Sequence, residues 1–145
     1  MHVVTGGAYN GKAAWVKEYY ELDQKKNFQW FNAYEDKPLP KSLENHNGMI
    51  VFEGIEQWVY QWMKGKGLEE ARKYGRYLIE EWVEWEEKDK GNHLIVLCTD
   101  ISKGIVPMDA DMRKWRDLTG WFYQDLVNRS KQVHLIWYGI AKQIK

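Results

Sequence analysis

Residues 6–13 have the sequence GGAYNGKA, and this segment decides the fold. It has the spacing G-x-x-x-x-G-K and follows the β-branched run 2–5. It precedes residues 13–26, whose apolar side chains are spaced for one buried helical face. In a loop between a strand and a helix, glycines let backbone N–H groups point at an anion, and the helix N-terminus adds a positive dipole. The segment therefore predicts a phosphate-binding loop; the alternative is a tight turn that uses glycine only sterically. The residues expected to bind nucleotide are Gly6, Gly7, Ala8, Tyr9, Asn10, Gly11, Lys12 and Ala13.

The last position of this loop departs from the usual pattern. A phosphate loop places Ser or Thr directly after the lysine, and its hydroxyl binds Mg²⁺. Here that residue is Ala13, and Ala14 cannot substitute because a methyl group has no lone pair. Lys12 would still reach the β- and γ-phosphates, whereas magnesium would depend on water, on the phosphates and on an acid from elsewhere. We expect nucleotide binding to tolerate this change better than phosphoryl transfer does.

The rest of the chain alternates between strands and helices. Further strands are expected at residues 28–34, 49–52, 94–97 and 133–138, and helices at 57–63, 68–88 and 110–128, the last capped by Asp109. This alternation predicts one α/β domain, residues 1–145, with a largely parallel sheet.

The connection between the second and third expected strands is unusual. A crossover between parallel strands is mostly helix, but this one contains Pro38 and Pro40. These prolines leave room for about one helical turn, near residues 42–44. We therefore expect an extended crossover or an exposed loop.

The composition excludes several classes of protein. The chain has 21 basic and 21 acidic residues among 145, and this zero net charge argues against nucleic acid or an anionic membrane as the partner. Cys98 is the only cysteine, so no intrachain disulfide can form. Residues 1–5 lack the features of a secretory signal, and no apolar run approaches the ~20 residues of a membrane helix. A cytoplasmic protein is the expectation.

Two acids follow expected strands. Glu53 comes directly after residues 49–52, where a carboxylate that holds magnesium belongs; the alternative is a polar residue that ends the strand. Asp100 follows the next strand, and both side chains should converge on one crevice. Glu56 could be a third member, but we expect it on the exposed face of a helix.

Three blocks of the sequence resemble the adenosylcobinamide kinase / adenosylcobinamide-phosphate guanylyltransferase family of cobalamin biosynthesis. The first is VTGGA, residues 4–8, with the following Gly-Lys pair, and the second is IVFEGI, residues 50–55. The third is GIVP, residues 104–107, with the pattern RxxRDxxG at 113–120 and the tail 139–145. This third block is more specific than a phosphate loop alone, whereas the middle of the chain is poorly matched.

The resemblance implies a P-loop NTPase fold of three layers, related to RecA, and a homo-oligomer. It implies phosphorylation of the aminopropanol hydroxyl of adenosylcobinamide, and then transfer of GMP through a histidine-linked guanylyl intermediate. Carried over to this sequence, the glycines and Lys12 would hold the phosphates of ATP or GTP, and Glu53 would hold Mg²⁺. Asp100 stands where the family usually has Glu and would position or deprotonate the hydroxyl. Lys12 and Asp100 are thus the expected catalytic residues, and residues 104–107 would lie at the edge of the active site.

The sequence departs from the family's pattern at positions that both expected reactions need. Ala13 replaces Ser and Gly54 replaces Cys, and the helix that carries the guanylylated histidine has no counterpart. His46 lies in the same interval but precedes a strand, at the edge away from the crevice. We predict a nucleotide-binding protein that phosphorylates a corrinoid hydroxyl if active and has lost guanylyl transfer. The alternative is a non-catalytic relative that binds nucleotide, corrinoid or a partner subunit, and no motif selects ATP over GTP.

The remaining chemistry-bearing residues favour structural roles. No spacing of His2, His93 and His134 suggests zinc, and Cys98 lies in an apolar run typical of a buried, inert thiol. A surface ion pair with Asp117 explains Arg113, the alternative being that Arg113 or Arg116 reaches a phosphate or a neighbouring subunit. The tryptophans at helical spacing are expected in the core or at oligomer contacts: Trp58, Trp62, Trp82 and Trp85.

Overall fold

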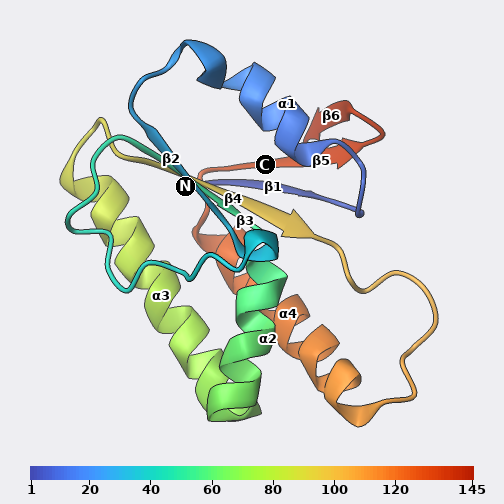
Figure 1. Ribbon diagram of the computed structural model, residues 1–145. Helices are drawn as coiled ribbons and strands as arrows, with labels where there is room; N and C mark the ends of the chain where they lie inside the picture. The colour runs from blue at the N-terminus through green and yellow to red at the C-terminus, as the bar shows by residue number, and fades with distance from the viewer.

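A computed structural model describes residues 1–145, and its centre is a six-stranded sheet (Figure 1). The strands are β1 (His2–Gly6), β2 (Phe28–Asn32), β3 (Met49–Glu53), β4 (His93–Thr99), β5 (Gln132–Trp137) and β6 (Ile140–Gln143). Their order is β2-β3-β4-β1-β5-β6, and every pair of neighbours is parallel except β5 and β6. The predicted α/β fold with a largely parallel sheet is confirmed.

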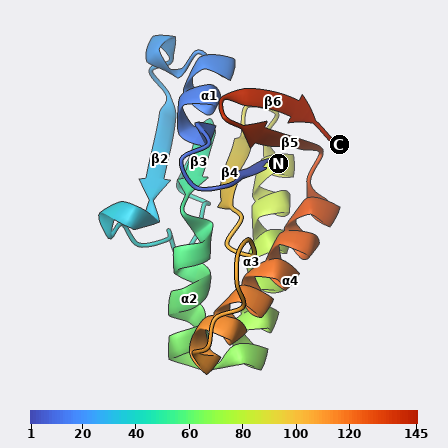
Figure 2. The ribbon, with the colours of Figure 1, turned by 90° about the vertical axis from the view of Figure 1, so that its right-hand side faces the viewer.

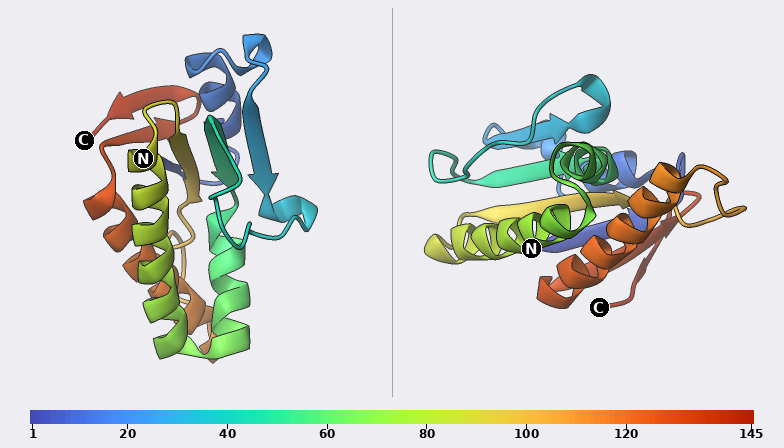
Figure 3. Two further views of the ribbon diagram at one scale, coloured as in Figure 1. Left: turned by 90° about the vertical axis from the view of Figure 1, so that its left-hand side faces the viewer. Right: turned by 90° about the horizontal axis from the view of Figure 1, so that it is seen from below.

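Helices cover both faces of this sheet, which gives three layers (Figures 2 and 3). The helices are α1 (Lys12–Tyr19), α2 (Ile55–Lys66), α3 (Leu68–Lys88) and α4 (Ala110–Arg129), with short 3₁₀ turns η1 (Leu22–Gln24) and η2 (Ala33–Glu35). α1 lies on one face, and α2, α3 and α4 lie together on the other. The two faces bury separate apolar clusters, of which the one beneath α2–α4 is the larger.

The sequence explains most of these elements. The centre of β4, residues 94–98, is an unbroken apolar run, as expected for a strand buried on both faces. α4 begins after Asp109, whose side chain accepts a hydrogen bond of 2.9 Å from the Met112 amide as an N-cap. In the core, Phe52 packs edge-on against Trp58 and tilted against Trp82, as expected for the helical tryptophans.

Several boundaries differ from the prediction. The first helix ends at Tyr19 rather than near residue 26, because Glu21 has a left-handed backbone (φ 50°) that a helix cannot continue through. α2 is longer than expected, and β6 was not expected as a separate strand. β6 returns antiparallel to β5 through a two-residue turn, which a pattern search for helices and parallel strands does not detect.

The crossover between β2 and β3 is extended, as predicted. Apart from η2 at its start, it contains no helix. Near residues 42–44, where the prolines leave room for about one turn, a single turn forms in which the His46 amide donates to the Leu43 carbonyl at 2.9 Å. No helix of the structure combines the length and the apolar character needed to cross a membrane.

Candidate functional site

The segment 6–13 joins the end of β1 to the start of α1, as a phosphate loop requires. Gly6 is fixed there by a close approach, because a Cβ on it would lie 2.3 Å from the Ile136 carbonyl oxygen of β5. Gly11 precedes the helix with a left-handed backbone (φ 85°), which glycine adopts without strain. The loop therefore has the predicted strand–loop–helix setting, and its glycines have identifiable steric reasons.

Lys12 folds back over its own loop. Its Nζ donates hydrogen bonds to the carbonyl oxygens of Gly6 (3.2 Å) and Gly7 (2.8 Å), and the residue is 9% exposed. Burial lowers the pKa of the Lys12 ammonium, and the nearby carboxylate of Glu56 acts in the opposite direction. The carbonyl partners are neutral, so a bound phosphate would offer this buried cation a stronger acceptor.

A cavity of about 660 Å³ lies against this loop. Residues 8–14 form one wall, and Tyr34, Glu53 and Thr99 from the ends of three neighbouring segments belong to the rest of the lining. The carboxyl ends of β3 and β4 open onto this cavity, which is where parallel α/β sheets bind ligands. Loop and sheet edge thus form one site, and sequence reasoning missed the contributions of Tyr34 and Thr99.

Glu53 lies where its position after the strand predicts. It ends β3, lines the cavity, and its Oε2 accepts a hydrogen bond of 2.8 Å from Trp30 Nε1. No group of three or more His, Cys, Asp or Glu side chains gathers in the structure to hold a metal unaided. Magnesium in nucleotide sites is held by one or two carboxylates together with phosphate oxygens, so a lone Glu53 fits an ion that arrives with its nucleotide.

Asp100 is hydrogen-bonded to the loop but does not line the cavity. Its amide donates to the Gly6 carbonyl at 3.0 Å, whereas its Oδ1 accepts from the Ser102 amide (2.9 Å) and hydroxyl (2.5 Å). Asp100 is not among the residues that line the cavity. The structure therefore brings Lys12 and Glu53 together and leaves the carboxylate of Asp100 outside.

Glu56 is buried, and the expectation that it lies on an exposed helical face is wrong. It is 1% exposed in the first turn of α2. Its carboxylate accepts hydrogen bonds from the hydroxyl of Tyr34, from Tyr123 Oη (3.2 Å) and from the Thr99 amide (3.4 Å). A sequence signal existed, because Glu56 has the i, i+3, i+7 spacing with the buried residues Val59 and Met63.

The two arginines of the third sequence block hold the loop before α4. Arg113 Nη1 donates to the carbonyls of Pro107 and Met108, and Arg116 Nη1 donates to that of Ile105 at 3.4 Å. No ion pair joins Arg113 to Asp117, so the predicted surface pair is wrong. Both arginine side chains therefore donate hydrogen bonds to backbone carbonyls of this exposed loop and not to a carboxylate.

His46 lies away from the cavity, as expected from its place before β3. Its ring meets Phe31 edge-on at 5.7 Å between centroids, and its carbonyl accepts from Trp85 Nε1 at 3.0 Å. Cys98 is buried as predicted, and burial raises the pKa of its thiol. Neither side chain lines the cavity.

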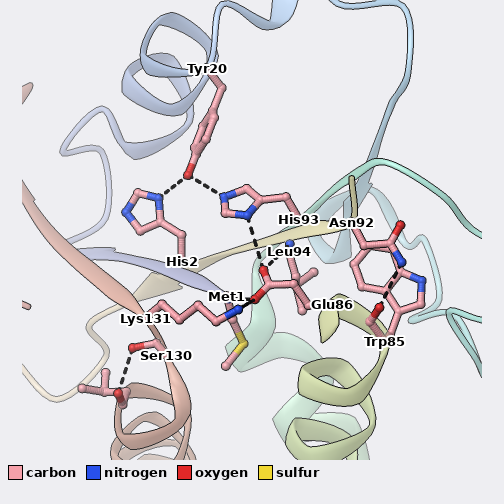
Figure 4. Close-up of polar contacts among 11 residues, drawn as sticks. Met1, His2, Tyr20, Trp85, Glu86, Asn92, His93, Leu94, Ser130 and Lys131 are labelled. Atoms are coloured by element: carbon pink, nitrogen blue, oxygen red, sulfur yellow. Dashed lines mark hydrogen bonds and ion pairs between the residues drawn. The ribbon is translucent and has the colours of Figure 1, made fainter. Parts of the chain in front are cut away.

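The other histidines form a hydrogen-bonded chain at the opposite edge of the sheet, part of which is visible in Figure 4. His2 lies between His134 (Nε2 to Nδ1, 2.9 Å) and the Tyr20 hydroxyl (2.6 Å), which in turn lies 2.9 Å from His93 Nε2. His93 Nδ1 is 3.4 Å from Glu86 Oε1. Burial lowers the pKa of His2 to about 3, with a smaller contribution from His134, so His2 is neutral at pH 7.

Comparison with models of protein families gives a match over most of the chain. A family model described as cobinamide kinase / cobinamide phosphate guanyltransferase matches residues 23–144. The matched range begins after α1, so it contains Glu53 and Asp100 but not the phosphate loop. No curated protein matches the chain.

Proposed function

Because the match covers most of its length, the chain belongs to the cobinamide kinase / cobinamide phosphate guanyltransferase family, and we propose that it binds a nucleoside triphosphate at the phosphate loop. Membership assigns it to a P-loop NTPase family of cobalamin biosynthesis. The observation that carries the proposal is that Lys12 and Glu53 line one cavity at the carboxyl edge of the sheet.

The loop's own groups would bind the phosphates. The N-terminus of α1 and the amides of residues 8, 9 and 11 would supply donors, and the Lys12 ammonium would exchange its two carbonyl partners for phosphate oxygens. Glu53 would hold magnesium, which when bound neutralises charge on the phosphates. Since no residue of the cavity identifies the base, ATP and GTP are both candidates.

The residues support the first of the family's two reactions. A corrinoid hydroxyl that entered the cavity would face the γ-phosphate, and Lys12 would stabilise the charge of the transferred group. The extended crossover without a helix and the packing of His46 against Phe31 support the loss of guanylyl transfer, because neither offers a nucleophile to the cavity. We therefore propose a kinase without the guanylyltransferase step.

A second candidate is a nucleotide-binding relative without catalysis. It is favoured by Ala13, which has no hydroxyl for magnesium, and by Asp100, whose carboxylate accepts from Ser102 instead of facing an acceptor hydroxyl. In that case the cavity would hold nucleotide as a signal or a structural ligand. The two candidates share the binding step and differ in turnover.

The test is calorimetric titration with ATP and GTP, each with and without Mg²⁺. Micromolar binding that tightens with magnesium is expected for the unmodified chain. Lys12→Met should weaken it about tenfold or more, since a charge-assisted hydrogen bond contributes about 1.5–3 kcal/mol. Lys41→Met, which changes an exposed lysine outside the cavity, is the matched control.

A phosphorylation assay on cobinamide then separates the candidates. A magnesium-dependent rate supports the kinase, whereas nucleotide binding without turnover supports the second candidate. No binding of either nucleotide would overturn both.

A further inference from the structure

We propose that the base of the nucleotide stacks on an aromatic rim formed by Tyr9, Trp137 and Tyr138. The inference rests on the proposed function and extends it, because it assigns the part of the ligand that the phosphate loop does not hold. The rim joins two segments that lie far apart in the sequence and side by side in the fold (Figures 1 and 2). The ligand that it fits is a flat heteroaromatic base attached to the bound phosphates.

The tip of the β5–β6 hairpin is fastened to the phosphate loop. Tyr138 (φ 49°) and Gly139 (φ 80°) form the two-residue turn, both left-handed as in a type I′ hairpin. The Gly139 amide donates a hydrogen bond of 2.9 Å to the Asn10 carbonyl. A Cβ on Gly11 would lie 3.6 Å from the Gly139 Cα, so the backbones pack closely. Tyr9 and Tyr138 each lie one residue from an end of this hydrogen bond.

The two tyrosines occupy backbone positions that suit glycine or asparagine. Tyr9 has φ 58° and Tyr138 has φ 49°, a region that bulky side chains rarely adopt. The fold buries little of either side chain in return, since Tyr9 is fully exposed, Tyr138 is 76% exposed, and neither hydroxyl makes a hydrogen bond within the chain. Strain of this kind concentrates at functional sites. A ligand that stacks on these rings would explain why tyrosine occupies both strained positions.

Trp137 extends the same surface. It is 63% exposed, and its ring lies 5.6 Å from that of Tyr138 at an interplanar angle of 39°. Exposed aromatic rings beside a phosphate-binding element are what base stacking uses, because every base has a π-face. In this proposal Tyr9, which lines the cavity, and the Trp137–Tyr138 pair on the attached hairpin tip together form the stacking surface.

The cavity itself indicates on which side the base leaves. Tyr9 lines the cavity, and so does Glu53 at the end of β3. In the proposed function, the metal and the γ-phosphate lie beside Glu53. The base, at the other end of the nucleotide, then extends away from β3, toward the β5–β6 tip that contacts residues 10 and 11.

The test compares ligands with and without a base. Tyr9→Gly and Tyr138→Gly remove each ring at a φ that glycine adopts freely, so the backbone of the loop and the turn is kept. ATP, GTP and inorganic tripolyphosphate are titrated calorimetrically into each protein. Each variant should weaken the binding of ATP, GTP or both roughly fivefold to a hundredfold, the range for one stacked base, and leave tripolyphosphate unchanged.

Tyr77→Ala is the matched control, because Tyr77 is an exposed tyrosine of α3 outside the cavity. It should change no affinity. If tripolyphosphate binds and neither glycine variant alters nucleotide affinity, the rim proposal is overturned while the phosphate loop stands. If no ligand of the three binds, the proposed function fails and the rim fails with it.

Sedimentation of the same variants tests whether a second copy of the chain, and not a base, covers these rings. Leu135 and Ile140, also exposed, adjoin Trp137 in the hairpin, so a second copy of the chain could cover it. An unchanged oligomeric state together with the affinity loss supports base stacking. A changed oligomeric state with unchanged affinity overturns it in favour of a subunit interface.

Discussion

The hydroxyl of Tyr34 donates a hydrogen bond to the buried carboxylate of Glu56, and this contact joins the crossover to the helix behind the cavity. A buried carboxylate is costly unless it is hydrogen-bonded, and here Tyr123 and the Thr99 amide complete its shell. Burial, with Glu56 adding to it, raises the pKa of the Tyr34 hydroxyl, so the hydroxyl keeps its proton at neutral pH. Since Tyr34 also lines the cavity, one side chain links the buried acid to the site.

Removing this donor should destabilise the fold. Tyr34→Phe leaves the Glu56 carboxylate without one of its partners, and we expect the free energy of unfolding to fall by about 1–3 kcal/mol. Urea denaturation measures the change. Tyr77→Phe removes an exposed hydroxyl and should alter the stability little; equal effects of the two variants would contradict the importance of the Glu56 contact.

Restoring a hydroxyl after Lys12 should raise activity if the site is otherwise competent. Ala13→Ser adds the missing magnesium ligand, and a roughly tenfold rise in the magnesium-dependent kinase rate is expected. Ala14→Ser places the same hydroxyl one position later and serves as the control. A rate that stays at zero in Ala13→Ser, with nucleotide still bound, would favour the non-catalytic candidate.

Two helical glycines should respond in opposite ways to the same substitution. A Cβ on Gly75 of α3 would lie 2.8 Å from the ring of Phe122, which is buried, so Gly75→Ala should cost about 1–3 kcal/mol of stability. Gly120 of α4 has no atom within 4 Å of its added Cβ, so Gly120→Ala should stabilise by about 0.5–1 kcal/mol. Thermal unfolding of both variants measures the pair, and a loss of stability in Gly120→Ala would contradict the open space.

Acid should destabilise the protein through His2. The unfolded chain binds a proton at this ring below about pH 6.5, whereas the folded chain does so only near its lowered pKa of about 3. Stability should therefore fall as the pH drops from 6.5 to 3, by about 1.4 kcal/mol for each pH unit from this ring alone.

Protonation of Glu86 should also lower the stability of the fold, at the acid end of this pH range. Burial alone would raise its pKa, but hydrogen bonds from His93, from the Met1 nitrogen and from the Leu94 amide hold it well below its usual value. Urea denaturation at a series of pH values measures the decline, and His2→Gln should make it shallower. An equal slope in that variant would assign the acid sensitivity to other groups.

The sequence predicted the elements better than their ends. The strands at residues 2–5, 49–52 and 94–97 and the helix at 68–88 follow from local hydrophobic period, and each forms within one or two residues of its expected bounds. The end of α1 and the β5–β6 turn were missed because single residues, Glu21 and Tyr138, adopt left-handed backbones that few side chains signal.

The candidate site was predictable in part. Lys12 and Glu53 follow from motif spacing and from position at a strand end, and the structure places both at one cavity. The direction of the Asp100 side chain depends on Ser102, and the burial of Glu56 depends on tyrosines from two distant segments. The first contact is a local one between residues two apart, which the strand-end pattern does not indicate. Helical spacing with Val59 and Met63 indicates that Glu56 faces the core, whereas its tyrosine partners come from tertiary packing.

The central place of β1 has a consequence for the order in which the protein assembles. Both strands that pair with β1 come from the later part of the chain: β4 ends at Thr99 and β5 at Trp137. The phosphate loop is thus synthesised before either of the strands that hold β1 in the sheet. The contacts that fix Gly6 form only when the residues after β4 and the strand β5 are in place. These contacts are the hydrogen bond from the Asp100 amide to the Gly6 carbonyl and the close packing of Gly6 against Ile136. Pairing over such long sequence separations is slow, so substitutions in β5 that touch no ligand should still delay the formation of the binding loop.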